Sequence, residues 1–97
     1  MLENIVFIAL RRKYSDIYYF REKGECDFVV REGKRITMAI QVCYEITSEN
    51  KDREINGLIE ALDAFKLNEG MILTYQQEDK IIIHQKTIKV IPVWKWL

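Results

Sequence analysis

Residues 25–44, ECDFVVREGKRITMAIQVCY, contain two apolar runs that alternate with polar residues on either side of Gly33. Alternation of this kind is typical of two antiparallel strands joined by a tight turn. If the turn places Asp27 opposite Gln41, the two-residue period of a strand puts Cys43 on the same face as both. The sequence therefore predicts that these three side chains share one small patch.

Hydrophobic periodicity predicts the elements on either side of this hairpin. Apolar residues at helical spacing predict a helix that starts at Met1 and ends near Lys13, and a second helix capped by Thr47 or Ser48. The predicted strands are 16–21, 26–31, 35–44, 71–75, 80–84 and 87–91. A short apolar strand that follows a helix is typical of parallel pairing after a crossover. We therefore expect an α+β fold with an α/β three-layer core, in the order helix, three antiparallel strands, helix, strand and terminal hairpin.

Length and charge limit the functions to be considered. The 97 residues suffice for one domain, and 15 basic side chains balance 15 acidic ones. Strong nonspecific binding to nucleic acid is therefore not expected. No apolar run approaches the roughly 18 residues of a membrane span, and no signal peptide starts the chain. By strand parity Cys26 and Cys43 point to opposite faces, so we expect reduced thiols and a cytoplasmic location.

The order of these elements resembles the restriction-endonuclease-like fold of the PD-(D/E)XK superfamily. It is more closely similar to the C-terminal domain of unknown function attached to a family of archaeal and bacterial AAA-type ATPases. The pieces that carry the resemblance are LENIVFIALRR, ECDFVV, IQVCYEI, the REI and LIEAL segments of the second helix, and IKVIPVWKWL. The resemblance implies that residues 1–97 are one nuclease-like domain at the C-terminal end of a larger chain, with an upstream ATPase domain as its partner. The 97 residues contain no GxxxxGK[ST] loop, so no nucleotide or other cofactor is assigned to them.

The resemblance also implies roles for four residues. In active members of the fold, an acid on the first helix and two on the sheet hold Mg²⁺, and a lysine orients the attacking water. By position Glu3 is the helix acid, Asp27 the first strand acid and Gln41 the second, while Cys43 stands in place of the lysine. Gln41 offers an oxygen without charge, and a neutral thiol cannot stabilise charge on a phosphate. We therefore expect a degenerate, inactive site, with Mg²⁺ on Asp27 and Glu3 only if activity survives.

Two alternatives remain open. The chain is a Mg²⁺-dependent DNA endonuclease if a displaced cation, Lys51 or Arg53, reaches the site from the second helix. It is a DNA-binding module without cleavage if its basic residues face phosphates; the candidates are Arg11, Arg12, Lys13, Lys51 and Arg53. The equal number of acids favours a solvated surface over either alternative.

Simple structural roles compete with these functional ones. Asp27 lies in mid-strand, where a hydrogen bond to Gln41 or to a helix end would explain it. Cys43 is expected to be a small core residue, and Glu3 equally fits a first-turn acid that favours the helix dipole. Alternation places Trp94 and Trp96 on one side of an extended chain end, where they either cover the core or dock onto another domain. His84 is expected to be a solvated strand residue. Tyr18, Tyr19 and Phe20 could stack on bases, but we expect them to fill the sheet face under a helix.

Overall fold

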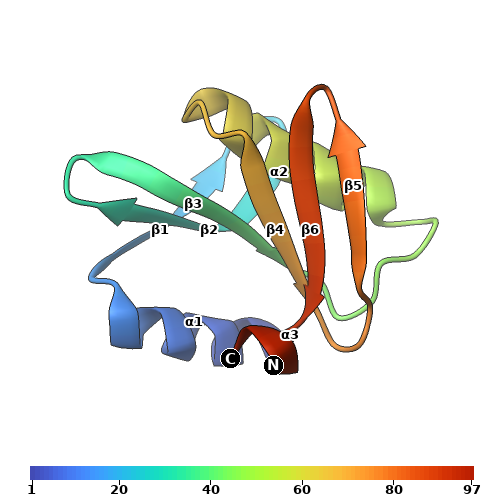
Figure 1. The fold of residues 1–97 in the computed structure, drawn as a ribbon, viewed down its shortest axis with the longest axis horizontal. Coiled ribbons are helices and arrows are strands. Elements are labelled where there is room, and N and C mark those ends of the chain that lie inside the picture. Colours follow the sequence, from blue (N-terminus) through green and yellow to red (C-terminus); the bar gives the residue numbers. More distant parts are fainter.

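Three helices and one six-stranded sheet make up the fold of the computed structural model, which describes residues 1–97 (Figure 1). The helices are α1 (Leu2–Lys13), α2 (Lys51–Ala64) and the short α3 (Val93–Trp96). The strands are β1 (Asp16–Arg21), β2 (Glu25–Glu32), β3 (Arg35–Val42), β4 (Glu69–Thr74), β5 (Asp79–Ile83) and β6 (Lys86–Pro92). The expected α+β class is confirmed. None of the three helices has both the length and the apolar character needed to span a membrane.

The sheet is mixed, with the strand order β1-β2-β3-β4-β6-β5. The first three strands pair antiparallel, β4 pairs parallel with both β3 and β6, and β5 closes the edge antiparallel to β6. Because α2 carries the chain from the end of β3 back to the start of β4, these two strands run in the same direction. The prediction of a parallel strand after the second helix is therefore confirmed.

Helices cover both faces of the sheet, so two separate hydrophobic clusters form (Figure 1). Under α2, the buried cluster contains Cys26, Val29, Ala39, Ile55, Leu58, Ala61, Leu62, Ile72, Ile88 and Val90. On the opposite face, α1 and α3 cover Val6, Leu10, Phe28, Val30, Ile40, Leu73 and Val93. Burial of these side chains is the main stabilising term of a domain of this size, at roughly 25 cal/mol per Å² of apolar surface.

A bulge in β2 alters the face of the residues before it. Phe28 pairs with Ile40 on β3, but on the β1 side Asp27 and Phe28 together lie opposite the single residue Tyr19. A bulge shifts the alternation by one residue, so Cys26 joins the cluster under α2. Cys43 packs against the same cluster, and the prediction that these cysteines face opposite sides is wrong; both are free thiols.

Two local predictions near the C-terminus also differ from the structure. The chain after Pro92 turns into α3, so Trp94 is exposed while Trp96 packs against the cluster under α1, and the two indoles do not share one side. The last hairpin turns at His84 and Gln85, whose φ values of 51° and 65° end β5 at Ile83, so His84 is an exposed turn residue.

The start of α2 lies slightly later than expected. The helix begins at Lys51 with Asn50 as its N-cap residue. Thr47 and Asn50 exchange two hydrogen bonds, since the Asn50 side chain accepts from the Thr47 N–H at 2.8 Å and the Thr47 hydroxyl accepts from the Asn50 N–H at 3.3 Å. Thr47 therefore stabilises the turn that leads into the helix, from a position outside it.

Candidate functional site

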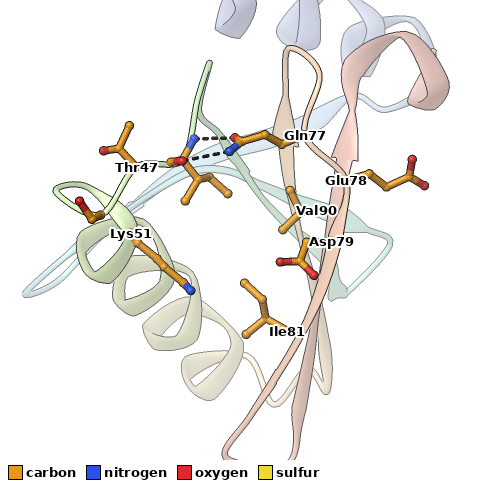
Figure 2. A pocket seen from close by; sticks show the side chains of 9 residues that line it. Thr47, Lys51, Gln77, Glu78, Asp79, Ile81 and Val90 are labelled. Atoms are coloured by element: carbon orange, nitrogen blue, oxygen red, sulfur yellow. Dashed lines mark hydrogen bonds between the residues drawn. The ribbon is translucent and has the colours of Figure 1, made fainter.

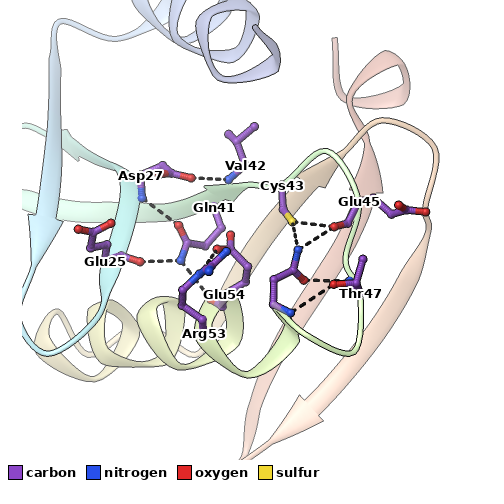
Figure 3. Close-up of polar contacts among 10 residues, drawn as sticks. Glu25, Asp27, Gln41, Val42, Cys43, Glu45, Thr47, Arg53 and Glu54 are labelled. Carbon is purple, nitrogen blue, oxygen red and sulfur yellow. Dashed lines mark hydrogen bonds and ion pairs between the residues drawn. The ribbon is translucent and has the colours of Figure 1, made fainter.

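Gln41 lies at the centre of the predicted site, on β3 under α2, and is only 2% exposed. Its Oε1 accepts a hydrogen bond from the Asp27 N–H at 3.0 Å (Figure 3). Its Nε2 donates to the Glu25 carbonyl at 2.6 Å and to the Glu54 carbonyl at 3.1 Å. The side chain therefore links β2, β3 and α2 through three backbone groups.

Gly57 lets α2 approach the strands closely enough for this linkage. A Cβ at Gly57 would collide with the Glu25 carbonyl oxygen and would lie 3.0 Å from Gln41 Nε2. Gly24, in the turn before β2, faces Gly57 and donates its N–H to Glu60 Oε1 at 2.9 Å. α2 therefore packs closely on the strands at Gln41.

Asp27 faces away from α2, toward the α1 side of the strands (Figure 3). Its Oδ2 accepts the Val42 N–H at 2.8 Å. The pKa of Asp27 is raised from 3.8 to about 6, mainly by burial; the Val42 N–H lowers this pKa, and the negative charges of Glu3 and Glu54 raise it. Glu3, on the first turn of α1, is therefore near enough to affect Asp27 electrostatically.

A polar hollow of about 280 Å³ lies beside Asp27 and Gln41. No hydrophobic residue lines it; the lining residues are Arg21, Lys23, Gly24, Glu25, Asp27, Gln41, Arg53 and Glu54. Two ion pairs lie in its lining, Arg53 to Glu54 at 3.4 Å and Arg21 to Glu25 at 3.7 Å. Burial raises the pKa of Glu54. The hollow therefore contains both signs of charge, and Cys43 and Glu3 lie outside its lining.

Cys43 stands just after β3, beside the loop that leads into α2. Its thiol donates to the Glu45 carbonyl at 3.2 Å and accepts from Asn50 Nδ2 at 3.6 Å (Figure 3). Burial, with the negative charge of Glu54, raises the pKa of the Cys43 thiol. The thiol is thus neutral at neutral pH and is directed to the loop. Asp27 and Gln41 are neighbours on β2 and β3, but their side chains point to opposite sides of the sheet because of the bulge in β2. The prediction that the three side chains share one face is therefore wrong.

The predicted basic residues do not form one surface. Lys51 reaches into a different hollow of about 590 Å³, opposite Asp79 and Ile81 (Figure 2). Arg53 lines the Asp27 hollow instead. The remaining three, Arg11, Arg12 and Lys13, end α1 on the other side of the sheet, where Arg11 donates to the Ser15 carbonyl at 2.7 Å.

The carboxylates near Asp27 do not make a cage for a metal ion. No three histidine, cysteine, aspartate or glutamate side chains lie close enough together to hold one. Asp27 and Glu3, the two predicted metal ligands, come from β2 and α1, and the amide oxygen of Gln41 is already bonded to a backbone N–H.

Sequence reasoning missed several residues of the hollow, namely Arg21, Lys23, Glu25 and Glu54. Arg21 and Lys23 flank the turn between the first two strands, and that turn had no functional signal. Glu54 immediately precedes Ile55, the first buried residue of α2. Its place at the edge of the apolar stripe was the one feature of the sequence that could have indicated that it faces the strands.

Comparison with known proteins places the chain in a family. A protein-family model described as "Domain of unknown function (DUF4143)" matches residues 1–96. The chain belongs to the DUF4143 family. It is 38% identical over 108 residues to "Uncharacterized protein MJ1544" of Methanocaldococcus jannaschii, a match that covers 99% of this chain and 24% of that protein. This DUF4143 chain therefore spans about a quarter of the relative's length, and no solved structure matches it.

Proposed function

We propose that this DUF4143 chain is a nuclease-like domain that does not cleave DNA and acts as an interaction module of a larger protein, with an AAA-type ATPase domain as its partner. The element order of helix, three antiparallel strands, helix and parallel strand supports the restriction-endonuclease-like assignment. The observation that carries the loss of cleavage is the commitment of Gln41 to three backbone hydrogen bonds.

A hard cation such as Mg²⁺ needs several oxygen ligands and benefits from their negative charge. For Gln41 to serve as a ligand, its Oε1 would have to leave the buried Asp27 N–H without a partner, at a cost of about 1–3 kcal/mol. It would bring no charge in return.

The residue at the position of the catalytic lysine is the second observation that supports the loss of cleavage. Cys43 supplies a neutral thiol that is bonded to the Glu45 carbonyl. A phosphoryl transition state gains negative charge, and a positively charged group at the attacking water normally offsets it. Cys43 cannot do this.

The interaction role is supported by the outer surface of α1. Ile5, Phe7 and Ile8 are exposed although α1 buries Val6 and Leu10 against the sheet. Apolar side chains that cluster on an exposed helix are typical of a surface covered by another protein domain. Because the relative from M. jannaschii is about four times as long as the matched segment, we assign this surface to the ATPase domain of the same polypeptide. The two free thiols support a reducing, cytoplasmic setting for the assembly.

Calorimetry with Mg²⁺ and Mn²⁺ and nicking of supercoiled DNA test the loss of cleavage. We expect no saturable heat at millimolar metal and no nicking by the unaltered chain, and the same result for Asp27→Ala. Nicking that is abolished in Asp27→Ala would overturn the proposal.

One observation favours the endonuclease alternative. Arg53 lines the same hollow as Asp27, whereas Lys51 points into another hollow. If this alternative holds, Arg53→Ala loses nicking activity and Lys51→Ala, its matched control on the same helix, keeps it. DNA binding through the predicted basic residues remains a prediction that a salt series in gel shifts tests.

A further inference from the structure

A separate hollow, of about 280 Å³, lies where the end of α1 meets α3 and β3, on the face of the sheet opposite α2 (Figure 1). Most of its lining is apolar; the lining residues are Ala9, Leu10, Arg12, Lys13, Tyr14, Met38, Trp96 and Leu97. We call it the α1–α3 hollow. An apolar cavity with a few polar groups is the usual form of a small-molecule site, and this cavity is at the small end of the usual range.

The floor of the α1–α3 hollow is part of the core. Leu10 is 1% exposed. Tyr14, Met38 and Trp96 are half-buried, and each packs against the hydrophobic cluster under α1 while it lines the hollow. Two of these side chains are aromatic, and the third is a polarisable thioether, which packs favourably against a ring. The floor is therefore better suited to a ligand with an aromatic body than to a flexible aliphatic chain.

The side chains that line the α1–α3 hollow carry charge of one sign. They include Arg12 and Lys13 and no acid, and neither cation belongs to an ion pair of the chain. The dipole of α1 favours both cations, because they lie in its last turn, but it does not supply a counter-ion. The hollow beside Asp27, in contrast, has as many acids as bases in its lining. The α1–α3 hollow is therefore complementary to an anion.

An aromatic carboxylate satisfies both the apolar floor and the positive charge. A carboxylate can accept two parallel N–H groups from a guanidinium, and an ammonium group beside it adds a second charge. We propose that the α1–α3 hollow binds a small aromatic carboxylate, with its ring on Met38 and Trp96 and its carboxylate at Arg12 and Lys13. This inference goes beyond the proposed function, because it depends neither on Asp27 nor on the surface assigned to the ATPase domain.

Trp96 fluorescence provides a direct test. In a Trp94→Phe background Trp96 is the only tryptophan, so titration with phenylbutyrate reports on the floor of the hollow itself. We expect a saturable change in emission with a Kd of about 1 mM or lower. Phenylbutanamide, which has the same shape without the charge, should bind at least about tenfold more weakly. NMR amide shifts of the unaltered chain, with the largest changes at the end of α1 and in α3, give the result independently of the Trp94 substitution.

Matched variants locate the binding. A double variant, Arg12→Gln with Lys13→Gln, should raise the Kd for phenylbutyrate at least about tenfold. The control is Lys34→Gln with Arg35→Gln, which removes the same charge from two exposed residues at the turn between β2 and β3 and should leave the Kd unchanged. Ala9→Leu fills part of the hollow from α1 and should also weaken binding about tenfold. Circular dichroism checks that all three variants are folded.

The comparison of phenylbutyrate with phenylbutanamide uses the unaltered chain, so it does not depend on the folding of any variant. The proposal is overturned if phenylbutyrate gives no saturable response by either method, or if phenylbutanamide binds as tightly. It is equally overturned if octanoate, which has the charge without the ring, binds more tightly than phenylbutyrate. Equal losses of affinity in the two double variants would place the anion elsewhere and would also overturn it.

Discussion

Gln41 and Asp27 lie next to each other on β3 and β2, but their side chains lie on opposite sides of the sheet and have different surroundings. On the α2 side, Gln41 is buried, neutral and bonded to three backbone groups. On the α1 side, Asp27 accepts one backbone N–H and carries a charge that its surroundings disfavour. Of two neighbouring polar positions, one is thus part of the framework, while the other remains a local cost to stability.

A substitution at Gly57, where α2 lies very close to β2, has the largest expected effect on stability. Gly57→Ala should lower the free energy of unfolding by about 4 kcal/mol, because its Cβ would collide with the Glu25 carbonyl oxygen and displace Gln41. Alanine normally stabilises a helix by about 1 kcal/mol relative to glycine, so the sign itself is informative. Urea denaturation measures the change, with exposed Asn56→Ala on the same helix as the control. If Gly57→Ala is as stable as Asn56→Ala, the close approach of α2 to β2 is wrong.

Removing the Gln41 amide comes next. Gln41→Leu leaves the Asp27 N–H and the carbonyls of Glu25 and Glu54 without their side-chain partner, at an expected cost of about 3 kcal/mol. Gln77 provides the comparison, since its side chain also makes two backbone hydrogen bonds, both to Ile46, at 2.6 and 3.0 Å, but is only partly buried. Gln77→Leu should therefore cost about 1 kcal/mol. Equal losses in the two variants would contradict the role of burial at Gln41.

A substitution of Asp27 is expected to raise the stability of the chain, whereas the substitutions of Gly57 and Gln41 lower it. Its folded pKa of about 6 lies above its ordinary value of 3.8, so the folded chain binds the proton more tightly than the unfolded chain does. Stability should therefore be highest below about pH 4, fall as the pH rises from about 4 to about 6, and level off above that. Asp27→Asn removes this fall and should stabilise the chain at pH 7 by about 1–2 kcal/mol, after allowance for solvent screening.

Denaturation midpoints from pH 4 to pH 8 check this prediction. Asp16→Asn is the matched control, because Asp16 pairs with Arg31 at 3.3 Å on the surface and should change stability by no more than about 0.5 kcal/mol. A wild-type profile that rises between pH 4 and 6, with no gain in Asp27→Asn, would show that Asp27 is stabilised as a carboxylate.

The sequence predicted the Gln41 side better than the Asp27 side. Turn chemistry at Gly33 and strand alternation give the pairing of Phe28 with Ile40, and small residues beside Gln41 indicate the close helix. The bulge at Asp27 and Phe28 depends on how β1 packs, and no local pattern encodes it. For that reason strand parity failed for Cys26, and the direction of the Asp27 carboxylate was not predictable.

Side-chain direction on helices was likewise beyond the sequence. Lys51 and Arg53 were equivalent candidates for a displaced cation, and only the packing of α2 on the sheet shows that Arg53 lines the Asp27 hollow while Lys51 lines a different one. The short helix α3 follows a proline and includes two tryptophans, a pattern that alternation reads as a strand end. In both cases the outcome depends on tertiary packing, which a single sequence records only indirectly.

The smallest effect tests whether α1 and Asp27 are electrostatically coupled. Glu3→Gln removes a negative charge that raises the pKa of Asp27, so that pKa should fall. Stability at pH 7 should change by no more than about 0.5 kcal/mol, because relief of repulsion is offset by loss of a favourable acid in the first turn of α1. NMR titration of the Asp27 carboxyl carbon separates these two contributions, since the helix dipole acts on Glu3 and leaves the titration of Asp27 unchanged. Glu49→Gln, an exposed acid in the loop before α2, should leave the Asp27 titration unaltered, and an equal response in both variants would mean that Glu3 has no special relation to the site.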